Sequence, residues 1–313
     1  MLNRIQRSPV VAAHLLLLTV VLVWGTTFTV VKTALADTSP LLFNLLRMVV
    51  AFVVLAAINW KSLRDVSRRE LLYATIAGIF LGLGYQFQTT GLELTTPSKS
   101  AFITGLVVVI VPLLCLIPGV KPSGLPATRW TGLIGAVIAF SGLILLTTPP
   151  GSGASLFKGI GLGEALTLAC AVAFAAHLLT LGHAARFTSA RTLGTVQIGV
   201  AAFLMLLTLP IGRRPFFHAT PRLFLALAIT SVLATAAAFT IQSWAQQHLS
   251  PTHTALIFTL EPVFAWLTSL LFLGERLGPR ALSGAALIIG GILVTELWPV
   301  AASQGLHPGG EAL

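Results

Sequence analysis

The chain has 313 residues, of which 56% are hydrophobic and only 9% are charged, and its formal net charge is +10. A soluble domain carries about 25% charged residues, so this chain has too little polar surface to cover its apolar side chains in water. The composition excludes a water-soluble globular protein and predicts an integral membrane protein whose solvent is the bilayer.

Apolar runs long enough to cross a bilayer follow one another along the chain. A helix needs roughly 20 apolar residues to span the hydrocarbon core, whereas strands of a membrane barrel are about half as long and alternate in polarity. The sequence therefore predicts an all-α fold with ten transmembrane helices. In chain order they cover residues 11–32, 40–59, 70–92, 97–117, 128–147, 160–182, 189–211, 222–246, 252–273 and 280–298.

Basic residues flank these runs instead of gathering in one patch. Arg4 and Arg7 precede the first run, and four more basic residues lie between the second and third runs. Because cytoplasmic loops are rich in Lys and Arg, this pattern predicts a multi-pass protein of the cell membrane, as in a bacterial inner membrane, with its N-terminus inside. Anionic lipid is a better partner for these charges than nucleic acid. The same orientation leaves several arginines outside without a physical explanation: Arg213, Arg214, Arg222, Arg276 and Arg280.

Two segments repeat the same spacing of helix starts. Pro97–Ile103 opens the fourth run and Pro251–Ile257 opens the ninth. Other positions that match are Trp24, Ser39 and Arg47 with Phe174, Ser189 and Gln197, Tyr85 and Gln88 with Phe239 and Gln242, and Gly135 and Gly142 with Gly284 and Gly291. Five helices are an odd number, so the second copy must be inverted in the membrane. The sequence predicts two inverted five-helix repeats, at residues 1–148 and 159–298, and a cytoplasmic tail at residues 299–313.

Five short motifs occur in a fixed order: Trp24–Phe28, Ser39–Pro40, Leu260–Ala265, Leu271–Glu275 and Gly284–Gly291. This set, within residues 11–298, resembles the EamA family of the drug/metabolite transporter superfamily. The resemblance implies two inverted repeats of five helices around a central cavity, and export of amino acids or other small metabolites. One departure is at the end of the fourth run, where the Gly-Glu signature frequent in relatives is replaced by Ile117–Lys121.

Two charged residues, Glu261 and Arg47, lie well inside predicted helices, away from the helix ends. Glu261 is near the middle of the ninth, where a carboxylate must be protonated, paired or in contact with water. We expect it to bind a substrate amine or to carry a proton; a hydrogen-bonding role beside Pro262 is the alternative. Arg47 could bind a substrate carboxylate, clamp helices together or reach the headgroups. Its matching residue is the neutral Gln197, so the fold does not need this charge in both copies.

The other candidate binding residues are aromatic or polar. They are Trp24, Thr27, Tyr85, Gln88, Gln242 and Trp244. We expect them to line a cavity formed by the first, third and fourth helices of each half, because these side chains have no other obvious role facing water. Packing between helices is the alternative for each of them.

No cofactor or metal is predicted. Cys115 and Cys170 are isolated in apolar runs, the seven histidines have no ligand spacing, and Gly151–Gly153 lacks the lysine of a nucleotide loop. An intramembrane enzyme would need convergent acids or metal ligands at one depth, which the pattern does not offer. The leading hypothesis is a secondary carrier of a small-molecule metabolite, surrounded by membrane lipids. A lipid-binding or scaffold protein stays open, as does the oligomeric state.

Overall fold

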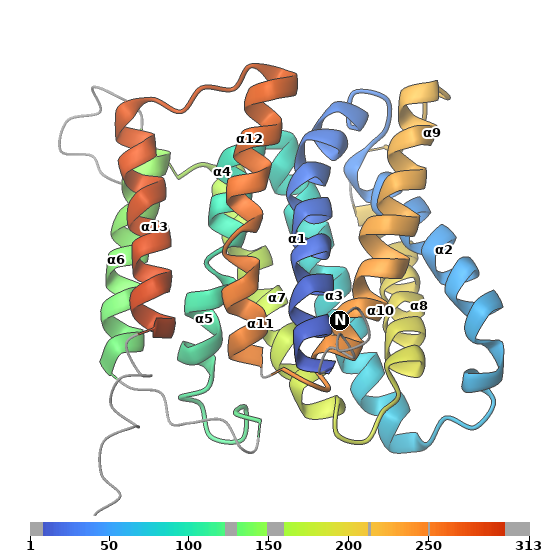
Figure 1. Cartoon of the computed structure of the whole chain (residues 1–313). Helices are drawn as coiled ribbons and strands as arrows, with labels where there is room; N and C mark the ends of the chain where they lie inside the picture. The colour runs from blue at the N-terminus through green and yellow to red at the C-terminus, as the bar shows by residue number, and fades with distance from the viewer. Residues whose placement is uncertain (1–8, 123–129, 149–159, 212–213, 250, 298–313) are drawn as a thin grey trace, which may run out of the picture.

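The computed structural model describes residues 9–122, 130–148, 160–211, 214–249 and 251–297. In this part of the chain the structure is helical, and the only strand-like pairing is an isolated bridge between Thr38 and Phe217. Figure 1 shows the helices running between an upper edge, where α1 ends, and a lower edge, where it begins. The predicted tail at residues 299–313 lies outside the described residues.

The elements agree closely with the predicted runs in order and position. They are α1 (Pro9–Ala34), α2 (Pro40–Asn59), η2 (Trp60–Leu63), α3 (Arg68–Leu94), α4 (Pro97–Thr104), α5 (Val107–Leu114), α6 (Trp130–Thr147), α7 (Leu162–Ala184), α8 (Ala190–Thr208), η3 (Leu209–Ile211), α9 (Pro221–Ala228), η4 (Ile229–Ala237), α10 (Ala238–Ala245), α11 (Pro251–Phe258), α12 (Glu261–Leu273) and α13 (Pro279–Leu297).

Helix starts follow from local chemistry. α3 begins with a capping box, in which the Ser67 hydroxyl accepts from the Glu70 N–H and the Glu70 carboxylate accepts from the Ser67 N–H. α2, α4 and α9 each have proline at the first position, where the missing N–H has no helical partner to lose. These signals fix where a helix begins, independently of the membrane.

Seven segments of the described chain are long and apolar enough to cross a membrane. Three further apolar helices are shorter: Leu133–Thr147, Glu261–Leu273 and Pro279–Val294. The all-helical membrane architecture is therefore found as predicted, whereas the number of ten spans is not established by helix length alone.

The fourth and ninth predicted runs are not continuous helices. The first is divided into α4 and α5 at Gly105 and Leu106, and the second into α11 and α12 at Thr259 and Leu260. Pro262 explains the second break, because it has no N–H to donate to the carbonyl of Phe258. The two breaks face each other, since a Cβ on Gly105 would lie 3.4 Å from Cγ of Pro262.

The eighth predicted run contains an unexpected π-helical segment. α9, η4 and α10 follow one another without a loop, and η4 has π-helical hydrogen bonding over Ile229–Ala237. π-helical turns are rare and occur frequently at functional sites. The matching part of the first half lies in the regular helix α3.

The matching glycines pack against each other at one side of the bundle. α6 and α13 lie side by side there (Figure 1). A Cβ on Gly142 would lie 2.5 Å from the Gly284 carbonyl oxygen, and a Cβ on Gly291 would lie 2.5 Å from that of Gly135. Glycine at these positions lets the two backbones approach closely, as small residues do between membrane helices.

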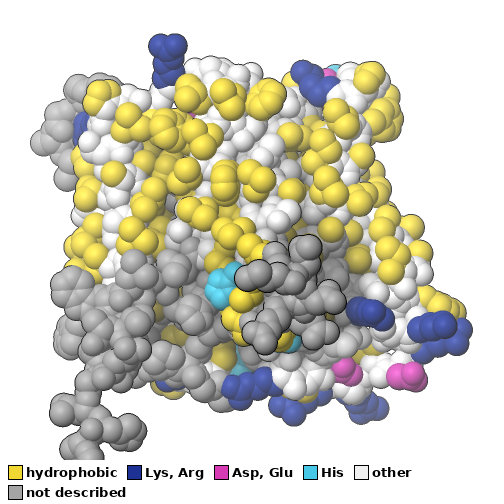
Figure 2. Space-filling view, viewed as in Figure 1, with side chains coloured by type: hydrophobic (Ala, Val, Ile, Leu, Met, Phe, Trp, Pro, Cys, Tyr) yellow, Lys and Arg dark blue, Asp and Glu magenta, His cyan; other side chains and the backbone are white. Residues whose placement is uncertain are grey.

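Apolar side chains cover the outer face of the bundle. Figure 2 shows a hydrophobic band over the middle of the molecule, with Lys and Arg at its two edges, mostly the lower one. Leu271 and Phe272 of α12 are 79% and 76% exposed. Such a large apolar surface is stable only in lipid, so the chain is a multi-pass membrane protein.

Candidate functional site

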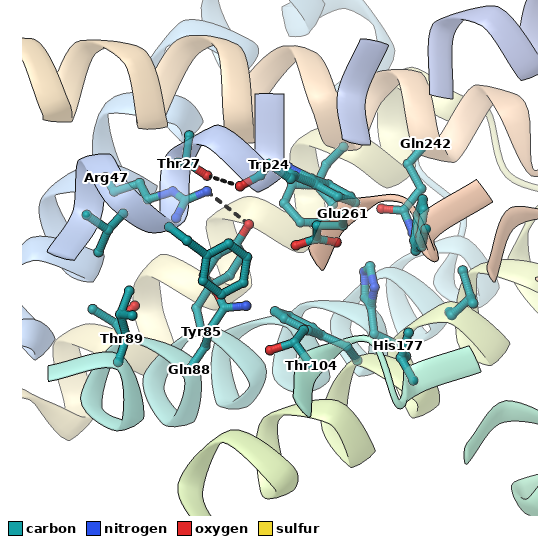
Figure 3. Close-up of a pocket in the computed structure, with 18 residues that line it drawn as sticks. Trp24, Thr27, Arg47, Tyr85, Gln88, Thr89, Thr104, His177, Gln242 and Glu261 are labelled. Carbon is teal, nitrogen blue, oxygen red and sulfur yellow. Dashed lines mark hydrogen bonds between the residues drawn. The ribbon is translucent and has the colours of Figure 1, made fainter. Parts of the chain in front are cut away.

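A central pocket lies between the two halves (Figure 3). Its cavity volume is about 60 Å³, which is room for a few water molecules. Its walls come from α1, α3, α4 and α5 of the first half and from α7, α10, α11 and α12 of the second, with Arg47 added from α2. These include the first, third and fourth helices of each half that the sequence predicted to surround a cavity.

Most of the lining residues fall into pairs that occupy matching positions in the two halves. The pairs are Trp24 and Phe174, Thr27 and His177, Phe28 and Leu178, Tyr85 and Phe239, Gln88 and Gln242, Thr104 and Phe258, and Val107 and Glu261. The repeat detected in the sequence therefore converges on this pocket from both sides.

The broken helices form one wall of the pocket. Thr104 ends α4 and Val107 begins α5, while Phe258 ends α11 and Glu261 begins α12, and all four line the cavity. Discontinuous helices at corresponding positions in two halves are typical of substrate sites in transporters built from repeats.

Glu261 is the acidic residue of the pocket wall, and its side chain points into the cavity (Figure 3). It is the first residue of α12, so its side chain lies at the positive end of the helix dipole. Hydrogen bonds between described residues do not include its carboxylate. Gly25 lets α1 approach this helix end, because a Cβ there would lie 2.7 Å from the backbone oxygen of Glu261.

Arg47 is buried and makes several contacts within the protein. Its Nε donates to Thr235 Oγ1 at 2.7 Å, and its Nη2 donates to Tyr85 Oη at 2.9 Å and to the Ala234 carbonyl at 3.3 Å. The guanidinium also lies 4.2 Å from the centre of the Tyr85 ring. These contacts join α2, α3 and η4. Arg47 therefore has the contacts expected of a clamp between helices, which is one of the three roles that the sequence suggests for it.

The π-helical segment η4 supplies an acceptor that both Arg47 and Trp24 use. Trp24 Nε1 donates to the Ala234 carbonyl at 2.8 Å. The indole ring also packs against Phe239 and Phe258, with ring centres 5.3 and 5.2 Å apart. Trp24 is thus fixed in orientation while it forms part of the aromatic wall.

His177 is a lining residue that sequence reasoning missed. Its Nε2 lies 2.7 Å from Gln197 Oε1, and Gln197 Nε2 donates to Ser243 Oγ at 3.3 Å. The seven histidines have no metal-ligand spacing, so the spacing alone gives no reason to select His177. The signal that could have found it is the repeat, because His177 matches Thr27, and its partner Gln197 matches Arg47.

Trp244 does not line this pocket, although the other seven predicted residues do. It lies in a separate groove beside α1 and α8 and packs on His248, with ring centres 4.7 Å apart. The reason is helical geometry: Gln242 faces the pocket, and a residue two positions later points about 200° away around the helix.

Comparisons with known proteins agree with this arrangement. Residues 11–148 and 161–297 each match the model of the EamA-like transporter family. An uncharacterised transporter of Archaeoglobus fulgidus is 32% identical over 91% of this chain and 86% of its own length. A second uncharacterised transporter of that organism is 24% identical over 90% of this chain and 96% of its own.

A solved structure has the same fold. It is a crystal structure of a protein with 20% sequence identity, and the match covers 92% of this chain and 97% of that one with a TM-score of 0.64. At this identity the likeness concerns the fold alone.

Proposed function

Because the chain belongs to the EamA-like transporter family, we propose that it is a secondary carrier that exports an amine-bearing metabolite, such as an amino acid, across the inner membrane. The two repeats, residues 1–148 and 159–298, are two inverted sets of five spans that rock about the central pocket. The family and the transporter names of the relatives point to transport and away from an enzyme.

The observation that carries this proposal is the carboxylate of Glu261. This carboxylate faces the cavity and receives no hydrogen bond from the described residues. A cationic group of the substrate would therefore pair with it. A charge at this depth is unfavourable unless it is neutralised. A proton would neutralise it in the empty carrier, so proton and substrate would compete.

The aromatic rings of the pocket wall also favour a cation. Aromatic rings surround the cavity, and ring faces attract ammonium groups. They belong to Trp24, Phe28, Tyr85, Phe174, Phe239 and Phe258. The other titratable or charged lining groups are Arg47, His177 and the Tyr85 hydroxyl. Arg47 donates to Tyr85, Thr235 and Ala234, and His177 bonds to Gln197. The amides of Gln88 and Gln242 are neutral and suit the polar part of a metabolite.

An asymmetry between the halves supports alternating access. Val31, Thr89 and Leu92 extend the pocket wall toward the upper edge. Their matching residues are Leu181, Ser243 and Gln246, which are similarly buried but do not line the pocket. Gln246 Nε2 donates to the Leu178 carbonyl at 3.2 Å and helps close that side. In an inverted repeat, exchanging the two arrangements would open the pocket to the lower edge. The small cavity would also have to widen to admit a metabolite.

A binding screen followed by a flux assay tests the proposal. Purified protein is heated with a panel of amines, amino acids and organic acids, because a ligand that binds the folded state raises Tm. We expect the stabilising compounds to carry an ammonium group and to be transported into proteoliposomes. Glu261→Gln keeps the shape and should lose both effects, whereas the control Glu93→Gln, outside the pocket, should keep them. Stabilisation without flux would favour the alternative of a lipid-binding or scaffold protein.

A further inference from the structure

A second pocket lies at the lower edge, where α3 begins and α7 ends. Its volume is about 290 Å³. It is lined by Arg69 and Tyr73 of α3 and by His183, Arg186 and Phe187 at the end of α7 and just beyond it. Two of these five side chains are cationic and none is a carboxylate, so the pocket offers a binding site for an anion.

Contacts between its walls fix the shape of this basic pocket. The Arg69 guanidinium lies 4.2 Å from the centre of the Phe187 ring. Tyr73 packs edge-on against Phe187 and stacks on His183, at 5.0 and 6.4 Å between ring centres. His183 Nε2 lies 2.9 Å from the Val120 carbonyl oxygen. The walls thus come from both halves and from the segment after α5, and contacts between the wall residues hold them in place.

The Arg69 guanidinium and the Tyr73 hydroxyl keep hydrogen-bond donors available in this arrangement. A guanidinium that lies on a ring face keeps its N–H groups in its own plane, where they can reach an anion at the edge of the ring. Described residues accept no hydrogen bond from the Arg69 guanidinium or from the Tyr73 hydroxyl. The nearest carboxylate in sequence, Glu70, accepts from the Ser67 N–H and takes part in the capping box instead.

The position of the basic pocket points to a lipid as the source of the anion. The lower edge carries most of the Lys and Arg visible in Figure 2, as the cytoplasmic side of a membrane protein does. Leu72 and Ile79, on the same helix α3, are 57% and 39% exposed, and they offer apolar surface for an acyl chain. Basic pockets at the ends of membrane helices suit acidic headgroups.

We propose that the Arg69 guanidinium and the Tyr73 hydroxyl bind the phosphate group of an anionic phospholipid of the cytoplasmic leaflet, and that the positive charge of Arg186 in the same pocket adds to the attraction. The bound lipid would bridge the two halves at the seam between α3 and α7. Arginine suits this role because its fork of donors matches two phosphate oxygens at once.

Native mass spectrometry and thermal unfolding of the full chain test the site. Protein in detergent is supplied with phosphatidylglycerol or, for comparison, phosphatidylcholine. We expect the wild type to retain phosphatidylglycerol selectively and to unfold at a higher temperature with it. Arg69→Gln/Arg186→Gln should weaken this binding by at least about tenfold, because charge-assisted hydrogen bonds are lost. Tyr73→Phe keeps the ring contacts and should weaken it less.

A matched control removes two charges at the same edge outside the pocket. Lys61→Gln/Arg64→Gln includes an arginine that also stacks on a ring, since Arg64 lies 4.5 Å from the Trp60 ring centre. This control should retain phosphatidylglycerol as the wild type does. Equal losses in the two double variants would overturn the proposal, because net charge alone would then explain binding. If Arg69→Gln/Arg186→Gln does not fold, an unchanged affinity in Tyr73→Phe would overturn it.

Inorganic phosphate alone distinguishes a lipid from a soluble anion. In lipid-free detergent we expect phosphate to raise Tm little. Stabilisation by phosphate that equals the effect of phosphatidylglycerol, and that is lost in Arg69→Gln/Arg186→Gln, would assign the pocket to a free anion and contradict the lipid.

Discussion

Asp37 and Arg222 join the two halves of the chain at the upper edge. Arg222 donates from Nε and Nη2 to Asp37 Oδ2 at 2.9 and 2.8 Å, and the Thr220 hydroxyl donates to the same oxygen at 2.7 Å. Asp37 lies in the connection between α1 and α2, and Arg222 lies in the first turn of α9. The predicted membrane orientation places Arg222 outside without a physical explanation. This contact explains it, because Arg222 is paired with a carboxylate of the other half.

This pair predicts a particular response to acid. Hydrogen bonds from Thr220 and Arg222 lower the pKa of Asp37. A carboxyl whose pKa is lower in the folded state stabilises the protein above its unfolded pKa of about 3.9, and this stabilisation is lost as the pH falls through the folded value. We expect Asp37→Asn to reduce Tm at neutral pH and to reduce the loss of Tm between about pH 7 and about pH 3.

The effect should be small, because the Arg222 side chain is 53% exposed and water weakens the attraction. Thermal unfolding in detergent across this pH range measures it. A variant whose Tm falls with acid as steeply as that of the wild type would contradict the prediction.

Gly25 sets the distance between α1 and the start of α12. A Cβ at this position would lie 2.6 Å from Cβ of Phe264 and 2.7 Å from the backbone oxygen of Glu261. We predict that Gly25→Ala displaces α12, destabilises the protein by about 1–3 kcal/mol and slows transport. Gly290→Ala is the control, since a Cβ there meets nothing within 4 Å. Equal stability of the two variants would argue against close contact at Gly25.

Arg47 should matter more for stability than for the choice of substrate. Arg47→Lys keeps the charge but cannot reproduce the contacts with Thr235 and Tyr85. We predict a loss of about 1–3 kcal/mol in stability, because buried polar groups are left without partners. The preference for cationic over anionic substrates should be unchanged in proteoliposomes. Normal stability with an altered preference would identify Arg47 as a substrate ligand.

Glu275 stabilises the start of a helix in the opposite half. Its Oε2 accepts from the N–H and the hydroxyl of Ser98, at 3.2 and 2.8 Å, in the first turn of α4, and it also accepts from the Ser269 hydroxyl. A carboxylate at a helix N-terminus is favoured by the dipole. We predict that Glu275→Gln lowers stability by about 1 kcal/mol. Thermal unfolding of this variant is compared with that of the control Glu93→Gln. Equal Tm values for the two variants would contradict the prediction.

The sequence predicted the positions of the helices well but not their internal hydrogen bonding. Residues 40–59 were predicted as one helix and form α2 with the same bounds, because Ser39 and Pro40 signal its start. Hydropathy reports that a segment lies in the membrane, not how its backbone is bonded. The breaks after Thr104 and Phe258 and the π-helical segment η4 were therefore not foreseen.

The repeat in the sequence allowed part of the pocket lining to be predicted, namely residues at matching positions in the two halves. Tyr85 and Gln88 matched Phe239 and Gln242 in the sequence, and all four line the cavity. His177 was missed although the same repeat places it opposite Thr27. Contacts such as that between Trp24 and the Ala234 carbonyl join residues far apart in the chain and depend on the π-helical turn, which the sequence pattern does not reveal.

Competition between substrate and proton at Glu261 is the most direct test of the account. The dissociation constant of a transported amine is measured against pH, over a range in which the amine keeps its charge, for the wild type and for Glu261→Gln. The account predicts that wild-type affinity falls as the pH is lowered, because a proton occupies the carboxylate, and that the variant binds weakly at every pH. Wild-type affinity that does not change with pH, or a variant that binds as tightly as the wild type, would contradict it.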